Sequence, residues 1–410
     1  MRFVEPPPNS RPTTLRHKTT PNTGVICVLS PYGDDRSSPQ GGVAAYTRQL
    51  LQYIPSDKQI VALTQLDSHQ QTCGSVAIEP TWNPDWRFLW RLARALRIYK
   101  PDLLHIQHEF RIFGGLLRTA SIVSSLRVIR PSDTAVVITL HSAIGRRDIT
   151  PSFLQRNRLR IPTRLAYWGI RFALGEIRRA SDQIIVHHAY FKDILITEYR
   201  YNPSHVHVIP IGATVNDGAE VQRHATSKQK NVLVFGFLTT YKYPELVLQL
   251  AQHTDSGDVN FWFAVGENPR DESTEHQCRL RDLRTGVEAL GDHGRWLGFV
   301  PDAQLDALFA MTDAVILPYI ECISVSAVAA LAVKHRVPIC HSVALRPLFG
   351  TGPLEFNLDE QSLQQAVNAA LDGVLGSDTI AGRLYAPLDE VGAMTAKVWE
   401  MACSARGTTH

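Results

Sequence analysis

The chain reads NVLVFGFLTTYK at positions 231–242, an apolar run followed by a glycine, a polar loop and a lysine. Two other stretches have the same form. An apolar run precedes GGVAAY at 41–46, and the run at 313–317 continues into PYIE at 318–321. A strand followed by a loop and a helix is the repeating unit of open α/β sheets, which bind ligands at the carboxyl ends of their strands. The three loops therefore predict two α/β domains that close on a phosphate-bearing ligand.

The strand pattern extends through both halves of the chain. Most runs are apolar without alternation, which is typical of buried parallel strands, and helical spacing follows the first loop at Val43, Tyr46 and Leu50. Strands that alternate with helices predict the α/β class, with two doubly wound Rossmann-like domains facing a central cleft. The expected strands of the second half are 232–235, 260–265, 296–299, 314–317 and 337–340.

The expected organisation has five parts. The polar tail is rich in Pro, Thr and Arg, the linker is rich in Gln, Lys and Ser, and the final helical segment is expected to pack back on the first domain. The parts are a disordered tail at 1–22, an N-terminal Rossmann-like domain at 23–217, a linker at 218–230, a C-terminal Rossmann-like domain at 231–385, and a C-terminal helix and tail at 386–410.

Composition narrows the class of protein. With 410 residues the chain can bury a large core in each of two domains. A net charge of +3 is too small to indicate nucleic acid as a partner. The six cysteines form no CxxC pair, so reduced thiols are expected. No apolar stretch approaches the roughly 18 to 20 residues that span a bilayer, and the N-terminus lacks a signal-peptide core. These features indicate a cytoplasmic enzyme.

Several short motifs occur together in one order along the chain. They are GGVAAY at 41–46, PDLLHIQHEF at 101–110 with FGG at 113–115, TLH at 139–141, VHVIPIG at 206–212, GFVPD at 298–302 and DAVILPY at 313–319. Over about residues 24–375 the chain resembles the family 4 glycosyltransferases of the two-domain GT-B type. The resemblance implies a retaining, metal-independent transferase of the hexosyltransferase type. Such an enzyme moves a sugar from a nucleotide-diphosphate sugar to a hydroxyl acceptor.

The resemblance also implies which partners to expect. It assigns the acceptor to the N-terminal domain and the nucleotide-sugar donor to the C-terminal domain. The donor is a co-substrate, so no cofactor and no metal are expected. The acceptor is a saccharide, a lipid-linked compound or a small molecule, and the sequence does not name the donor sugar or its base.

Lys242 is the expected cation of the donor site. Charge grows on the diphosphate as the sugar bond breaks, and a nearby cation lowers the barrier. A helix that begins beside this lysine favours the same anion. The alternative is a solvated lysine at a helix start. Glycine at positions 41, 42 and 236 lets backbone approach the ligand, so Gly41, Gly42 and Gly236 are donor-site candidates. The turn at Val300 is expected to contact the base.

Histidines and a carboxylate mark the ends of two runs in the first domain. The resemblance places His141 beside the reacting sugar, where it is expected to hydrogen-bond a hydroxyl. His108 and Glu109 are candidates for catalysis or acceptor binding, because open α/β sheets bind ligands at strand ends. His105, in the same run as His108, is expected to be structural.

Two features depart from the family pattern. No basic residue lies at 237–241, where family members commonly carry an arginine, and Glu321 is followed by no carboxylate at 322–337, where they commonly carry a second glutamate. Glu321 either contacts the donor sugar or is a surface carboxylate, and Ser324 and Ser326 either bind phosphate or cap a helix. Two alternatives therefore stay open: a catalytically silent GT-B protein that binds a sugar or a partner, and a GT-B enzyme of different chemistry, such as sugar phosphorolysis.

Residues 146–180 contain nine arginines against only two carboxylates, interleaved with large apolar side chains. Such a stretch either lies on an anionic membrane or faces a phosphorylated acceptor, or it forms two amphipathic helices with a solvated basic face. The protein is therefore expected in the cytoplasm, either free or peripheral to the inner face of the membrane.

Overall fold

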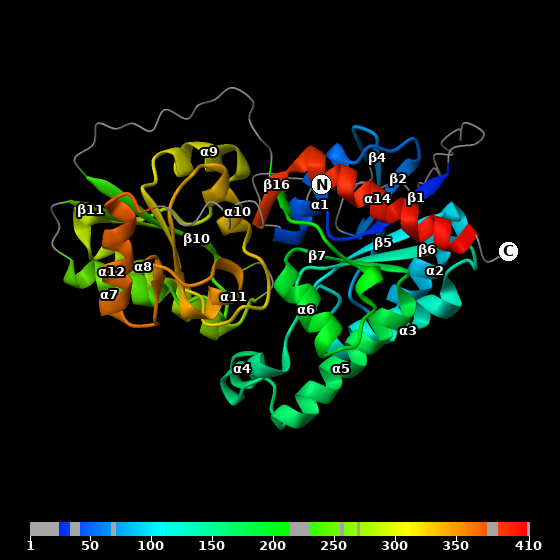
Figure 1. The fold of residues 1–410 in the computed structure, drawn as a ribbon, viewed down its shortest axis with the longest axis horizontal. Coiled ribbons are helices and arrows are strands. Elements are labelled where there is room, and N and C mark those ends of the chain that lie inside the picture. The colour runs from blue at the N-terminus through cyan, green and yellow to red at the C-terminus, as the bar shows by residue number, and fades with distance from the viewer. Residues whose placement is uncertain are drawn as a thin grey trace, which may run out of the picture.

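The computed structural model describes residues 24–32, 42–66, 71–110, 112–213, 229–254, 258–268, 271–374 and 384–407. Two sheets, each flanked by helices, stand side by side (Figure 1). The α/β prediction with two doubly wound domains is confirmed. The expected tail at 1–22 and most of the expected linker lie outside the described residues.

The first sheet has the strand order β3-β4-β2-β1-β5-β6-β7-β8. All neighbours pair in parallel except β3, which is antiparallel to β4. The central strands β5 and β6 are buried along their whole length, which explains their apolar sequence. The strands are β1 Val25–Leu29, β2 Gln59–Gln65, β3 Gln71–Cys73, β4 Val76–Trp82, β5 Leu103–His108, β6 Ala135–Leu140, β7 Gln183–Val186 and β8 Val206–Val208.

Helices cover both faces of this sheet. One face packs against α2, α3 and α5, and the other against α1 and the C-terminal helix. The helices of this half are α1 Gly42–Tyr53, α2 Phe88–Tyr99, α3 Leu116–Ile129, α4 Pro151–Arg156, α5 Thr163–Ala180 and α6 Ala189–Thr197, with short 3-10 turns η1 Arg146–Asp148 and η2 Pro203–His205.

The second sheet is wholly parallel, in the order β12-β11-β10-β13-β14-β15. Its strands are β10 Lys230–Phe237, β11 Val259–Gly266, β12 Gly294–Trp296, β13 Ala314–Leu317, β14 Ile339–Ser342 and β15 Glu355–Phe356. Its helices are α7 Pro244–His253, α8 Thr274–Glu288, α9 Asp302–Ala310, α10 Ala327–Lys334, α11 Arg346–Phe349 and α12 Glu360–Leu371, with turns η3 Gly291–His293 and η4 Val343–Leu345.

Two expected strand boundaries were wrong. The strand expected at 296–299 ends at Trp296, because Gly298 adopts a positive φ of 64° and turns the chain. The strand expected at 337–340 is shifted to Ile339–Ser342, because Pro338 has no N–H to donate to a neighbouring strand.

The C-terminal segment crosses from the second domain to the first. β16 (Tyr385–Pro387) pairs in parallel with β9 (Ile211–Ala213), and α14 (Leu388–Gly407) then packs on α1 and β6 (Figure 1). The approach to α1 is close, because a Cβ added at Gly392 would lie 2.2 Å from the Tyr53 carbonyl oxygen. The crossing holds the two domains together at the edge of the central cleft. Among the described residues, no helix is long and apolar enough to cross a membrane.

Candidate active site between the two domains

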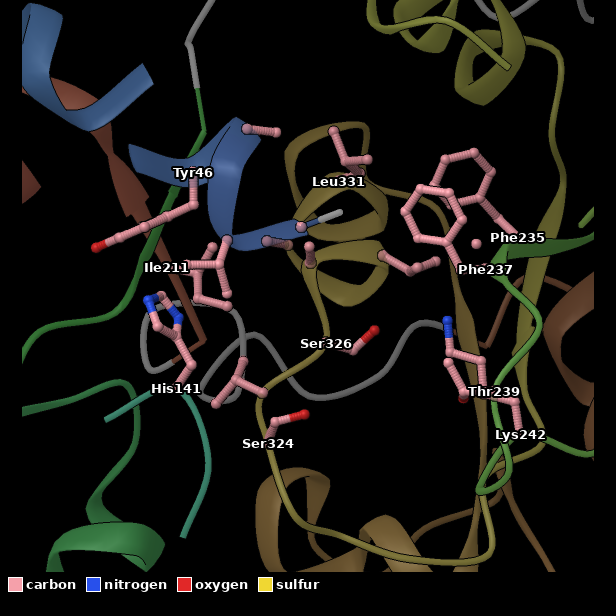
Figure 2. Close-up of a pocket in the computed structure, with 18 of the residues that line it drawn as sticks. Tyr46, His141, Ile211, Phe235, Phe237, Thr239, Lys242, Ser324, Ser326 and Leu331 are labelled. Carbon is pink, nitrogen blue, oxygen red and sulfur yellow. The ribbon is translucent and has the colours of Figure 1, made fainter. Parts of the chain in front are cut away.

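A cavity of about 440 Å³ lies between the domains. The loops that follow β6 and β7 and the start of α1 line it from the first domain, and the loops that follow β10, β11 and β13 line it from the second. Figure 2 shows His141, Lys242, Ser324 and Ser326 around this space. The carboxyl ends of two parallel sheets thus face one another, as expected for a ligand site in open α/β folds.

Lys242 is held at the cavity by the loop that connects β10 to α7. This loop is pinned to the chain after β13, because Tyr243 N donates to Pro318 O (2.8 Å) and Ile320 N donates to Tyr241 O (2.8 Å). From α8, Arg279 donates to the carbonyl of Lys242 (2.7 Å) and to that of Thr239 (2.9 Å). The backbone of the loop is therefore fixed from two sides.

The Lys242 ammonium group has no carboxylate partner among the described residues. Its Nζ lies 5.3 Å from the centre of the Tyr319 ring, a distance compatible with a cation–π contact. Burial lowers the pKa of Lys242 from its usual value. A partly desolvated cation that no protein anion neutralises favours an anionic ligand, which would raise this pKa again.

Gly236, the single glycine of β10, makes room for the lysine. It adopts a φ of +112°, and a Cβ at this position would lie 2.6 Å from Lys242 Nζ. Any other residue would both strain the backbone and displace the ammonium group. Gly236 therefore determines where the positive charge sits.

Ser324 and Ser326 lie on the loop that leads into α10. In Figure 2 both side chains point into the cavity, on the side where Lys242 ends. Ser326 precedes the first residue of α10, but its side chain makes no cap hydrogen bond and instead shares one with the Tyr319 hydroxyl (2.9 Å). The first-turn N–H groups of α10 therefore have no side-chain cap, and the helix dipole adds positive potential there.

Two aromatic rings form another wall of the cavity. Phe237 and Phe299 stack with 6.2 Å between ring centres and 14° between planes, and Val300 lies next to Phe299. Flat apolar surfaces of this kind suit a planar ring in a ligand. The aromatic pair was not foreseen from the sequence.

His141 follows β6 and takes part in a buried chain of hydrogen bonds. Its Nδ1 lies 3.2 Å from His187 Nε2, and its Nε2 lies 2.8 Å from Gln107 Oε1. His187 Nδ1 donates to the carbonyl of Ile209 (2.9 Å). Burial lowers the pKa of His187 to about 4, which keeps it neutral at pH 7. Both ring nitrogens of His141 thus have protein partners.

The same chain reaches the C-terminal helix. Trp399 of α14 donates its indole N–H to His105 Nδ1 (3.2 Å), and His105 Nε2 then donates to Thr139 Oγ1 (2.8 Å). The Gln107 side chain lies between His105 and His141, with Nε2 3.5 Å from His105 Nε2 and Oε1 2.8 Å from His141 Nε2. The hydrogen bonds hold α14, β5 and β6 in one arrangement beneath the cavity.

Glu321 forms an ion pair with an arginine of the other domain. Arg156, at the end of α4, donates its Nε to Glu321 Oε1 (2.9 Å), and the carboxylate is almost fully buried. Nearby, Ala143 N donates to Ile323 O (3.1 Å) across the same gap. The Glu321 carboxylate lies at the cavity, but its charge is already balanced within the protein.

His108 does not reach the cavity. Successive side chains of a strand point to opposite faces, so Gln107 faces α14 whereas His108 faces the other side of β5. There His108 is fully buried beside Phe110 and Phe113 (ring centres 5.2 and 6.3 Å away), and neither ring nitrogen has a partner among the described residues. Glu109, one residue further, does line the cavity.

Most of the other sequence-predicted residues line the same cavity. Gly41 lies outside the described residues. The structure brings the following together at the cavity: Glu109, His141, Gly42, Gly236, Lys242, Val300, Glu321, Ser324 and Ser326.

Comparison with known proteins agrees with this geometry. Residues 40–216 match the profile of Glycosyltransferase Family 4. These residues, which are fewer than half of the chain, are therefore similar to a family 4 glycosyltransferase domain. The whole chain has the GT-B fold, since it aligns with sucrose-phosphate synthase of Thermosynechococcus elongatus at a TM-score of 0.68 and 16% identity, over 94% of this chain and 99% of the other.

Two further solved structures have the same fold. HepE of Anabaena, in complex with UDP and glucose, aligns at a TM-score of 0.60 and 16% identity, over 94% of this chain and 98% of the other. The catalytic domain of starch synthase IV from Arabidopsis thaliana, bound to ADP and acarbose, aligns at 0.59 and 13% identity, over 94% and 99%. No curated protein sequence matches the chain.

Several residues that fix the site were not predicted from the sequence. Arg156 and Arg279 hold Glu321 and the Lys242 loop, yet they lie 165 and 37 residues away from them in the chain. No local pattern marks such partners. His187 is different, because it directly follows β7, as His141 follows β6, and its place at a strand end was a usable signal.

Proposed function

We propose that the chain is a retaining, metal-independent glycosyltransferase that moves a hexosyl group from a nucleotide-diphosphate sugar to a hydroxyl acceptor. The observation that carries this proposal is the Lys242 ammonium group, which lies at the cavity without a carboxylate partner among the described residues. A diphosphate that leaves the sugar develops negative charge, and a preplaced cation stabilises that charge.

The surroundings of Lys242 support a nucleotide diphosphate rather than a simple phosphate. The uncapped start of α10 provides N–H groups on one side, and the wall of Phe237, Phe299 and Val300 offers an apolar surface for a base. Solved structures of the same fold hold UDP, UDP-glucose or ADP. In this proposal the positive charge comes from the lysine and the helix, so no metal ion is required for leaving-group departure.

The sugar would lie between the domains, beside Glu321 and His141. Both ring nitrogens of His141 have protein partners. In this proposal His141 gives up one of these partners when the donor binds and then forms a hydrogen bond with a sugar hydroxyl. Glu109, on the first domain, faces the acceptor. These roles, and retention of the anomeric configuration, are part of the proposal.

A second candidate is a catalytically silent GT-B protein that binds a sugar or a partner. The observation that favours it is the ion pair of Arg156 with Glu321, which engages the only carboxylate that the loop after β13 offers among residues 318–326. A buried ion pair resists separation, because removing one partner leaves a desolvated charge. If the pair persists when donor binds, Glu321 cannot contact the sugar.

Calorimetric titration with UDP, GDP, ADP and dTDP tests the donor site. One nucleotide is expected to bind in the micromolar range, and Lys242→Ala is expected to weaken it. The matched control is Lys230→Ala, at the opposite end of β10, where the lysine is exposed and pairs with Asp313. Failure of all four nucleotides to bind, or an equal loss in both variants, would overturn the nucleotide-diphosphate site.

Product analysis separates the enzyme from the silent protein. With the nucleotide sugar whose base binds, and a panel of saccharide and lipid-linked acceptors, turnover in the presence of EDTA and retention of the anomeric configuration are expected. The silent protein would be favoured if the unmodified protein binds the nucleotide but neither transfers the sugar nor hydrolyses the donor, and if Arg156→Gln gives the same result.

A further inference from the structure

The outer side of α5 exposes an unusual set of large apolar side chains. Leu165, Trp168 and Phe172 are 59%, 62% and 55% exposed. They are spaced by three and four residues, so they form one stripe along the helix. The opposite side of α5 packs into the core through residues such as Ile170 and Leu174. The helix therefore buries one side in the core and exposes the stripe on the other.

The segment that leads into α5 continues the apolar stripe. Leu159 and Ile161 are 44% and 43% exposed. In the chain they lie shortly after Asn157, which lines the cavity between the domains. The exposed apolar surface thus begins close in the chain to a residue of the candidate active site and continues along α5. In Figure 1, α4 and the start of α5 project from the rest of the molecule beside the gap between the domains.

Arginines flank the stripe. Arg160 and Arg164 are exposed and make no ion pair among the described residues. Arg171 lies with its guanidinium 5.7 Å from the centre of the Trp168 ring and donates to the carbonyl of Glu198 (3.1 Å), and it forms no ion pair within the part of the chain that the structure describes. The face therefore combines an apolar stripe with uncompensated positive charge.

No exposed acidic side chain balances this charge on the helix. Glu176, the single carboxylate of α5, is buried and is held by Ser124 and Arg127 of α3 and by Arg179. A protein partner of ordinary composition would have to supply both acidic and apolar groups in the matching arrangement. An anionic lipid surface supplies both, because headgroups carry the charge and the boundary with the acyl chains accepts the apolar side chains.

We propose that the face formed by Leu159, Arg160, Ile161, Arg164, Leu165, Trp168, Arg171 and Phe172, here called the α5 face, docks the protein on an anionic lipid surface. Tryptophan is the side chain best suited to the interface between headgroups and acyl chains. The proposal does not depend on the donor site, since lipid binding is measured without nucleotide or acceptor.

Flotation of the full chain with vesicles tests this proposal. Vesicles of phosphatidylcholine that contain phosphatidylglycerol are expected to bind the protein, and vesicles of phosphatidylcholine alone are expected to bind it weakly. The double variant Arg160→Gln/Arg164→Gln is expected to lower the partition coefficient roughly 30-fold on the anionic vesicles. Raised salt is expected to weaken binding of the unmodified protein more than that of this variant.

The apolar half of the face is tested with Trp168→Ser/Phe172→Ser. This variant is expected to lose at least about tenfold in partition, because two large side chains no longer enter the lipid boundary. The matched control is Trp90→Ser/Arg94→Gln on α2, where another exposed tryptophan lies 5.7 Å from an arginine. Melting temperatures of all variants are expected to stay close to that of the unmodified protein, since the side chains are exposed.

Three results would overturn the proposal. The first is that the protein does not bind anionic vesicles. The second is that the α2 control loses as much vesicle binding as the α5 variants. The third is that the protein does not bind vesicles but sediments as a dimer, which the α5 variants convert to a monomer. The last result would identify the α5 face as an interface between copies of this chain. Nucleotide titration of the same variants is expected to be unchanged, which separates this test from that of the donor site.

Discussion

Gly236→Ala is the sharpest single perturbation of the candidate donor site. The methyl group would lie 2.6 Å from Lys242 Nζ, a distance that the two atoms cannot keep. The new residue would also have to adopt a φ of +112°. The substitution therefore has two separable effects, a strained backbone and a displaced cation.

Both effects can be given a size. Holding a residue other than glycine in this region costs about 1–3 kcal/mol, which lowers the melting temperature of a domain of this size by about 2–4 °C for each kcal/mol. Loss of a charged hydrogen bond to a phosphate costs about 1.5–3 kcal/mol, which weakens nucleotide binding roughly 10- to 150-fold. We expect Gly236→Ala to show most of this loss of affinity.

A double-mutant cycle read by calorimetry isolates the displaced cation. Because the methyl group acts through Lys242, the variant Gly236→Ala/Lys242→Ala is expected to bind the nucleotide about as weakly as Lys242→Ala alone. The control is Gly373→Ala, which has a φ of +90° but no atom within 4 Å of the added Cβ. It should lower the melting temperature without changing affinity. The reasoning would be refuted if the double variant lost affinity by the product of the two single losses, or if Gly373→Ala weakened nucleotide binding as much as Gly236→Ala.

Two further predictions concern the buried histidines. Trp399→Phe removes the donor to His105 Nδ1 and should lower the free energy of unfolding by about 1–3 kcal/mol. Trp90→Phe, at an exposed position, should change this free energy little. Equal free energies of unfolding in urea for the two variants would contradict the buried hydrogen-bond chain. Burial lowers the pKa of His105 and His108 to about 3 and that of His187 to about 4. Below about pH 6.5 the unfolded chain therefore binds protons that the folded protein does not. Each of these histidines should then lower the free energy of unfolding by up to about 1.4 kcal/mol for each unit by which the pH falls. Urea unfolding at pH 7 and pH 5 checks this, and equal free energies at the two pH values would show that these histidines are not buried in the neutral form.

Sequence patterns were sufficient for the architecture. Apolar runs without alternation marked most of the parallel strands, because strands buried on both faces have no polar side to show. The ends of strands were less certain, as at Trp296 and Ile339, where a glycine with positive φ and a proline set the boundary. Such boundaries depend on one residue, whereas the strands themselves depend on many.

The sequence by itself predicted that the loops at 41–46, 236–242 and 318–321 would face one cleft between two α/β domains, because ligands bind at the carboxyl ends of strands in open sheets. It thus named Lys242 and Glu321, and the family resemblance added His141. Only the tertiary structure decided what each side chain touches. Strand alternation turned His108 away from the cavity, a relay of side chains occupied both nitrogens of His141, and Arg156 and Arg279 arrived from other elements to hold Glu321 and the Lys242 loop. Periodicity along the chain encodes which face a residue occupies, but contacts between residues far apart in the chain arise only when the domains pack.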